Sequence, residues 1–138
     1  MSGPALKHVD SHSSIHEAAL QEAVEITGML EHLLRNQRME QALELAYVLI
    51  EHWETRTLRH ADEEEKGLYK ELAEQDLNLK EDIIALTRDH ELLRLLAKEI
   101  KERLSAGGMD ESVLQRFHAL ILVDQLHNQK ELQILPHH

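Results

Sequence analysis

The chain has 138 residues, enough for one domain (residues 1–138) with a single core, and its 42% apolar content with only five Gly and two Pro favours helices over an all-β fold. It contains no cysteine, which excludes disulfides, iron–sulfur clusters and thiolate zinc sites, so a bound metal would need nitrogen and oxygen ligands. The net charge of -11 argues against a nucleic-acid partner, and no apolar run approaches the ~20 residues of a membrane span, so we expect a cytoplasmic protein that binds neither nucleic acid nor membrane.

Apolar positions recur at helical spacing along nearly the whole chain and predict four helices. The first is predicted over residues 14–35, with Ser14 as the start of a capping box and residues 1–13 as an N-terminal extension. The second is predicted over residues 39–74, and Gly67 near its end is a weak point or kink.

The third helix is predicted over residues 80–105 and stops at Gly107 and Gly108, the clearest terminator in the chain. Asp110 then caps the fourth helix, which continues to about Leu135. Four helices with short connections pack most easily as an antiparallel up-down-up-down bundle. The sequence therefore predicts an all-α four-helix bundle.

Each predicted helix has one row of core-facing positions. On the third helix this row is Ile83, Leu86, His90, Leu93, Ala97, Ile100 and Leu104. Polar side chains on the four rows follow one pattern twice: a lone histidine, then a histidine and a glutamate four residues apart on the next helix. These residues are His16, His60 and Glu64, followed by His90, His127 and Glu131.

Four imidazoles and two carboxylates, supplied evenly by two halves, form a ligand set for two transition-metal ions. A histidine and an acid four residues apart share one helix face, so both can reach the same ion or two adjacent ions. Burying an ionised carboxylate costs several kcal/mol unless it is paired or bound to a metal, and no Lys or Arg lies on the rows near Glu64 and Glu131. The alternative is a structural bundle in which these residues are incidental, since a lone buried imidazole is more often a hydrogen-bonded core residue.

The other histidines have separate interpretations. An N-terminal zinc cluster is an alternative use of His8 and His12, which precede His16 at intervals of four residues. The histidines that lie off the core-facing rows are interpreted as surface or rim residues: His32, His52 and His118.

Three further polar features bear on the site. Within the acidic run 62–65, only Glu64 has the register to point into the core, and the rest is interpreted as a solvated face. Asp124, three residues before His127, is a candidate to orient an imidazole from behind. Tyr69 is interpreted as a packing residue.

The candidate ligands stand in the order His16, His60-Ala-Asp-Glu-Glu64, Asp89-His90-Glu91 and His127-Asn-Gln-Lys-Glu131. This order resembles the hemerythrin-like (HHE cation-binding) domains, and the resemblance extends from His16 to Ile134-Leu135-Pro136, which is similar to the end of the family's last helix. Oxygen carriers of that family usually have two histidines four residues apart on the third helix. Here Leu86 and Arg94 occupy the positions four residues before and four residues after His90. The pattern looks more like the bacterial hemerythrin-like proteins and an iron-sensing domain of a eukaryotic ubiquitin-ligase subunit.

The nitrogen-rich, oxygen-containing ligand set favours iron over calcium or magnesium. The resemblance implies a centre of two iron ions, oxo- or hydroxo-bridged, with glutamates between the ions and histidines completing the shells. We expect a protein that binds or reacts with a small oxidant, namely peroxide, dioxygen or nitric oxide, and that consumes peroxide if it is an enzyme. The alternative is an iron- or oxygen-sensing or iron-storage protein without turnover. The oligomeric state is expected to be a monomer or a homodimer.

Overall fold

The computed structural model describes the backbone of residues 4–135 and the side chains of residues 15–135. The described chain is helical throughout, apart from short turns, and contains no strand. Its elements are α1 (Pro4–Arg35), α2 (Met39–His52), the π-helical segment η1 (Trp53–Leu58), α3 (Arg59–Lys66), α4 (Leu68–Gln75), the short 3-10 helix η2 (Leu77–Leu79), α5 (Lys80–Gly107) and α6 (Glu111–Ile134). The all-α fold predicted from the sequence is confirmed.

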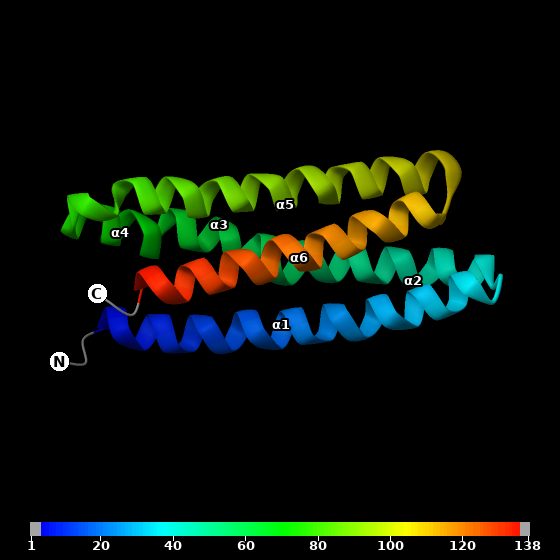
Figure 1. Cartoon of the computed structure of the whole chain (residues 1–138), viewed down its shortest axis with the longest axis horizontal. Coiled ribbons are helices and arrows are strands. Elements are labelled where there is room, and N and C mark those ends of the chain that lie inside the picture. Colours follow the sequence, from blue (N-terminus) through cyan, green and yellow to red (C-terminus); the bar gives the residue numbers. More distant parts are fainter. Residues whose placement is uncertain (1–3, 136–138) are drawn as a thin grey trace.

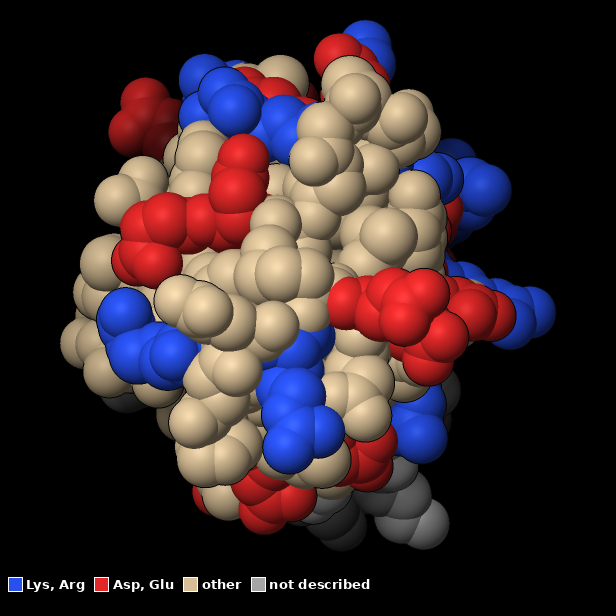
Figure 2. Space-filling view, turned by 90° about the vertical axis from the view of Figure 1, so that its right-hand side faces the viewer, with Lys and Arg blue, Asp and Glu red and all other residues tan. Residues whose placement is uncertain are grey.

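The elements of residues 4–135 make up four long rods. These rods lie side by side (Figure 1). α1, α5 and α6 make one rod each, and α2, η1, α3 and α4 follow one another along the fourth. α1 packs against α2 and α6, while α5 packs against α6 and α2. The start of α1 and the end of α6 lie at the same end of the molecule (Figure 1). Figure 2 views the opposite end, where acidic and basic side chains are interspersed rather than gathered into one face of a single sign.

The core has two apolar clusters. The larger one contains Trp53 and Phe117, and the smaller one contains Tyr69 and lies at the end of the bundle near α4. All seven positions of the row predicted on the third helix are buried in α5. Along that row Leu86 belongs to the smaller cluster and Leu93 to the larger, with His90 between them. A buried polar layer therefore separates the two apolar clusters.

The helix ends are partly as predicted. Gly108 ends α5 with a φ of 79°, a left-handed conformation that glycine adopts without strain. The Asp110 carboxylate accepts a hydrogen bond from the Val113 backbone N–H at 2.9 Å and so caps α6. The predicted start of the first helix at Ser14 is wrong, because α1 already begins at Pro4. Proline suits the first position of a helix, where its missing N–H would have no intrahelical partner.

The second rod departs from a continuous helix in two places. The predicted kink at Gly67 is present: its φ of -113° and ψ of -90° interrupt the helix between α3 and α4. The π-helical turn η1 was not predicted; such wide turns occur often near functional sites. The break at Gly67 changes the register, because Glu64 and Tyr69 are five residues apart and yet both face the core. Within residues 4–135, no helix has the length and apolar character needed to cross a membrane.

Candidate metal centre

All six side chains singled out by the repeated sequence pattern meet in the polar layer between the apolar clusters. Five of them are buried, and the His60 side chain is 18% exposed. Two groups have ligand atoms that lie within 4.8 Å of one another: His16 with His60 and Glu64, and Glu64 with His90 and His127. Glu64 belongs to both groups, so its carboxylate lies between two potential metal positions. The role of the six side chains as metal ligands stays a prediction.

The distances between the donor atoms are short and similar. Glu64 Oε1 lies 3.3 Å from His16 Nε2 and 3.5 Å from His90 Nε2. His127 Nε2 lies 3.2 Å from both His90 Nε2 and Glu131 Oε2, and Glu131 Oε1 lies 3.7 Å from His16 Nε2. Two atoms bound at about 2.1 Å to one ion, at roughly a right angle, are about 3 Å apart. The cluster therefore has the spacing of neighbouring ligands in a coordination shell.

Two of the imidazoles contact a carboxylate of a neighbouring helix through Nδ1, the ring nitrogen that points away from the cluster. His90 Nδ1 lies 2.8 Å from Glu65 Oε2, which accepts a hydrogen bond from Arg94 at 2.6 Å. His127 Nδ1 lies 3.0 Å from Asp89 Oδ2, which is 3.2 Å from Lys130 Nζ. The interpretation of Glu65 as part of a solvated face is thus wrong. Glu65 follows Glu64 directly on α3, so its side chain points away from the centre of the bundle and towards α5.

The interpretation of Tyr69 as a packing residue is incomplete. Its ring stacks on the His90 ring with centroids 5.5 Å apart, and its hydroxyl donates a hydrogen bond to Glu131 Oε2 at 2.5 Å. The hydroxyl also lies 3.3 Å from His127 Nε2. Burial, followed by the charges of Glu64 and Glu131, raises the pKa of the Tyr69 phenol, so it stays protonated and acts as a donor.

Asp124 is 1% exposed, and neither of its carboxylate oxygens has a hydrogen-bond partner. The prediction that it orients an imidazole is not met, since Asp89 performs that role for His127. Burial raises the pKa of Asp124 to about 6, although the charges of His16 and His127 oppose the shift. Asp124 therefore carries a high desolvation cost beside the candidate centre.

The same surroundings favour the charged form of two imidazoles. Burial lowers the pKa of His16, but its hydrogen bond to Glu64 and the charges of Glu64 and Glu131 outweigh burial and raise it. Burial also opposes the charged form of His127, but Glu131 and Asp89 raise the pKa of His127 to about 9. The site thus attracts positive charge, whether as protons or as metal ions.

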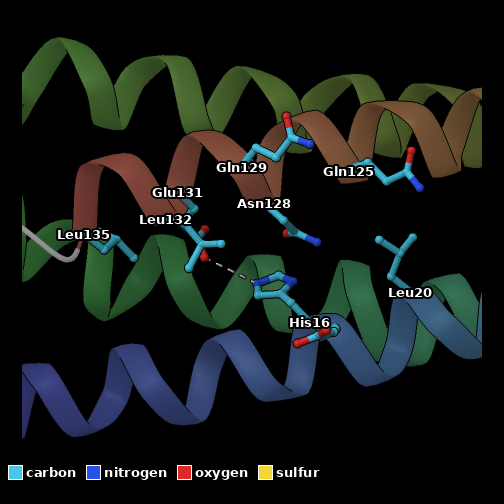
Figure 3. Close-up of a pocket in the computed structure, with 9 residues that line it drawn as sticks. His16, Leu20, Gln125, Asn128, Gln129, Glu131, Leu132 and Leu135 are labelled. Atoms are coloured by element: carbon cyan, nitrogen blue, oxygen red, sulfur yellow. Dashed lines mark ion pairs between the residues drawn. The ribbon is translucent and has the colours of Figure 1, made fainter.

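A pocket of about 420 Å³ opens between α1 and α6 and reaches the cluster (Figure 3). His16 and Glu131, which belong to the cluster, are among the residues that line it. Its other walls combine leucines with amide side chains and one acid: Glu17, Leu20, Gln125, Asn128, Gln129, Leu132 and Leu135. Small molecules can reach His16 and Glu131 by this route.

Three histidines outside the rows have described side chains, and all three lie as predicted, at the surface or rim. His32 and His118 are exposed, and His118 Nε2 lies 3.0 Å from Glu31 Oε1. His52 is partly buried, with Nε2 2.9 Å from the Ala19 carbonyl oxygen. The side chains of His8 and His12 lie outside the described residues, so the alternative of an N-terminal zinc cluster stays a prediction.

Comparisons of this chain with models of protein families, with curated proteins and with solved structures found no match. The kind of site must therefore be inferred from the residues and their geometry alone.

Proposed function

We propose that the protein is a non-haem di-iron protein of the hemerythrin-like kind, built on an antiparallel up-down-up-down bundle. The packing of consecutive rods and the course of the ribbon in Figure 1 support this topology. Two iron ions would be held by four histidines and two glutamates: His16, His60, Glu64, His90, His127 and Glu131. A monomer or homodimer in the cytoplasm is the expected setting.

The observation that carries the proposal is the convergence of acceptor atoms around His90 Nε2 and His127 Nε2. Carboxylates stand at Nδ1 of both rings, and a neutral ring that donates from Nδ1 has only a lone pair at Nε2. The two Nε2 atoms nevertheless face each other at 3.2 Å, with oxygens of Glu64 and Glu131 within 3.5 Å of one or the other. Such a group of acceptors repels itself unless positive charge lies among them, supplied either by protons on the imidazoles or by metal ions. Nitrogen and carboxylate oxygen are donors that suit iron.

Bound iron would supply open coordination positions and redox chemistry towards a small oxidant, with peroxide or dioxygen first and nitric oxide next. The protein's own groups prepare this chemistry in three ways. The pocket between α1 and α6 admits a small molecule to His16 and Glu131. The Tyr69 hydroxyl donates to Glu131 and so fixes the orientation of that carboxylate. The two apolar clusters on either side limit access of water.

A second candidate function is iron or oxygen sensing, or iron storage, without turnover. It is favoured by the position of the cluster, whose ligands come from α1, α3, α5 and α6 and therefore from all four rods. An ion that binds groups from all four rods stabilises their packing, and its loss loosens the whole bundle. Metal occupancy would then be read as a change in stability.

Metal analysis tests the proposal most directly. Protein loaded with iron(II) without oxygen and then exposed to air is expected to hold about two irons per chain and to show a near-ultraviolet oxo-bridge band. His60→Ala, Glu64→Ala, His127→Ala and Glu131→Ala should each lower the iron content strongly. His118→Ala is the matched control, because this exposed histidine on α6 lies outside the cluster. Full iron content in all four cluster variants would contradict the proposal.

Peroxide consumption separates the two candidate functions. Rapid removal of added peroxide by the iron-loaded protein supports turnover, whereas iron binding that raises stability without peroxide removal supports sensing or storage. The His118→Ala variant should behave as the unmodified protein in both assays.

A further inference from the structure

The two metal positions implied by the cluster are not equivalent. One is formed by Glu64, His90 and His127, each at most 2% exposed, and is called here the inner position. The other is formed by His16, His60 and Glu64 and is called the outer position. At the outer position the His60 side chain is 18% exposed, and His16 lines the pocket between α1 and α6. The outer position is therefore closer to solvent.

Two chains of charged groups stand behind the imidazoles of the inner position. In the first, His90 Nδ1 lies 2.8 Å from Glu65 Oε2, and Arg94 donates to the same oxygen at 2.6 Å and to Asp62 at 2.7 Å. In the second, His127 Nδ1 lies 3.0 Å from Asp89 Oδ2, with Lys130 Nζ at 3.2 Å from that oxygen. Both have the same order: an imidazole, a carboxylate of the neighbouring helix and a cation.

We propose that the chains His90–Glu65–Arg94 and His127–Asp89–Lys130 preorganise the inner position, so that it fills before the outer one and binds its ion more tightly. The inference depends on the proposed metal-binding function. It assigns Glu65 and Asp89 as positioning residues, which act through the imidazoles and do not bind the ions.

The physical reason lies in what a carboxylate does to the ring that it contacts. By accepting the Nδ1 proton it selects the tautomer whose Nε2 lone pair faces the cluster, and it fixes the plane of the ring. It also makes Nε2 a stronger donor to a metal. The cation at the end of each chain holds the carboxylate in place, which reduces the conformational freedom lost when the ion binds.

In two pairs of adjacent residues, one side chain faces the cluster and the other contacts an imidazole of the next helix. Glu64 faces the cluster while Glu65 holds the His90 ring of α5. His90 faces the cluster while Asp89 holds the His127 ring of α6. The inner position is thus braced from α3 through α5 to α6. Removing Glu65 or Asp89 as a carboxylate should weaken that position alone.

The test is a calorimetric titration of metal-free protein with cobalt(II), whose visible absorption reports its coordination. The unmodified chain is expected to bind two ions in two steps of different affinity. Glu65→Gln and Asp89→Asn should each weaken the tighter step by about 10- to 100-fold and leave the weaker step within experimental error. His60→Ala should abolish the weaker step and retain one tightly bound ion.

Glu91→Gln is the matched control, since Glu91 is an exposed acid of α5 beside His90 that pairs with Arg88. It should leave both steps unchanged, and circular dichroism checks that every variant keeps its helices. The inference is overturned if Glu65→Gln and Asp89→Asn leave the tighter step unchanged, or if His60→Ala removes it. A single binding step in the unmodified chain overturns the inference as well, while leaving the metal-binding proposal intact. Absence of any binding by the unmodified chain contradicts that proposal too.

Discussion

Asp124 offers a quantitative test of the electrostatics of the cluster. In the metal-free protein burial raises the pKa of this carboxylate to about 6, against an ordinary value of 3.8 for an exposed aspartate. The folded-state pKa is raised, so the ionisation cost is absent below the unfolded value and is complete once the pH exceeds the folded value. A shift of about 2 pKa units corresponds to about 3 kcal/mol of unfolding free energy lost on going from acid to neutral pH.

The perturbation is Asp124→Asn, which removes the charge and keeps the shape. Asparagine adds its own cost for a buried amide, but that cost does not depend on pH. The useful quantity is therefore the change with pH of the difference in unfolding free energy between variant and unmodified protein. Between about pH 4.5 and about pH 8 this difference should move by about 2 kcal/mol in favour of the variant.

The assay is urea denaturation of protein kept metal-free with a chelator, followed by circular dichroism at several pH values. Glu91→Gln is the control, because an exposed acid should produce no such trend. A difference between Asp124→Asn and the unmodified protein that stays constant over this pH range would contradict a raised pKa for Asp124. It would mean that the Asp124 carboxylate is solvated or paired in the folded state.

Three other predictions concern helix geometry and metal linkage, each measured by denaturation. Gly28→Ala should stabilise α1 by about 0.5–1 kcal/mol, since an added Cβ meets nothing within 4 Å. Gly67→Ala should bring no such gain, because its Cβ would lie 3.2 Å from the Glu63 carbonyl oxygen. Equal effects of the two substitutions on the unfolding free energy would contradict this prediction. Asp110→Ala should cost about 1 kcal/mol by removing the cap on the Val113 N–H, and an unchanged stability would argue against the cap. Each iron site at which free iron(II) is about 100 times the dissociation constant of that site should raise the unfolding free energy by about 2.7 kcal/mol, and a chelator should reverse the effect.

Much of the fold was predictable because local patterns determine it. Helical spacing alone places Leu86, His90 and Leu93 on one buried face of α5, and the terminator at Gly108 and the cap at Asp110 follow from backbone preferences. The start of α1 was harder to predict, since Pro4 permits the helix to begin well before the capping box expected at Ser14. The π-helical turn η1 has no comparable sequence signal.

The candidate ligands were predictable for a different reason. A glutamate on an apolar row is costly to bury, so Glu64 and Glu131 stand out without any knowledge of their neighbours, and both are buried. Glu65 and Asp89 do not stand out in this way. They lie beside the core-facing rows and reach an imidazole of the next helix, so only the packing of the rods identifies them.

Periodicity and the cost of burying charge are local properties, so the amino-acid sequence is enough to identify the helical class, the buried faces and the six polar residues on those faces. Which groups those six residues contact depends on how the helices pack. The break at Gly67 turns the Tyr69 hydroxyl towards Glu131, and the packing of α1 against α6 leaves a pocket that reaches His16. Such contacts join residues far apart in the chain, and their distances depend on how the rods pack, which no local pattern specifies.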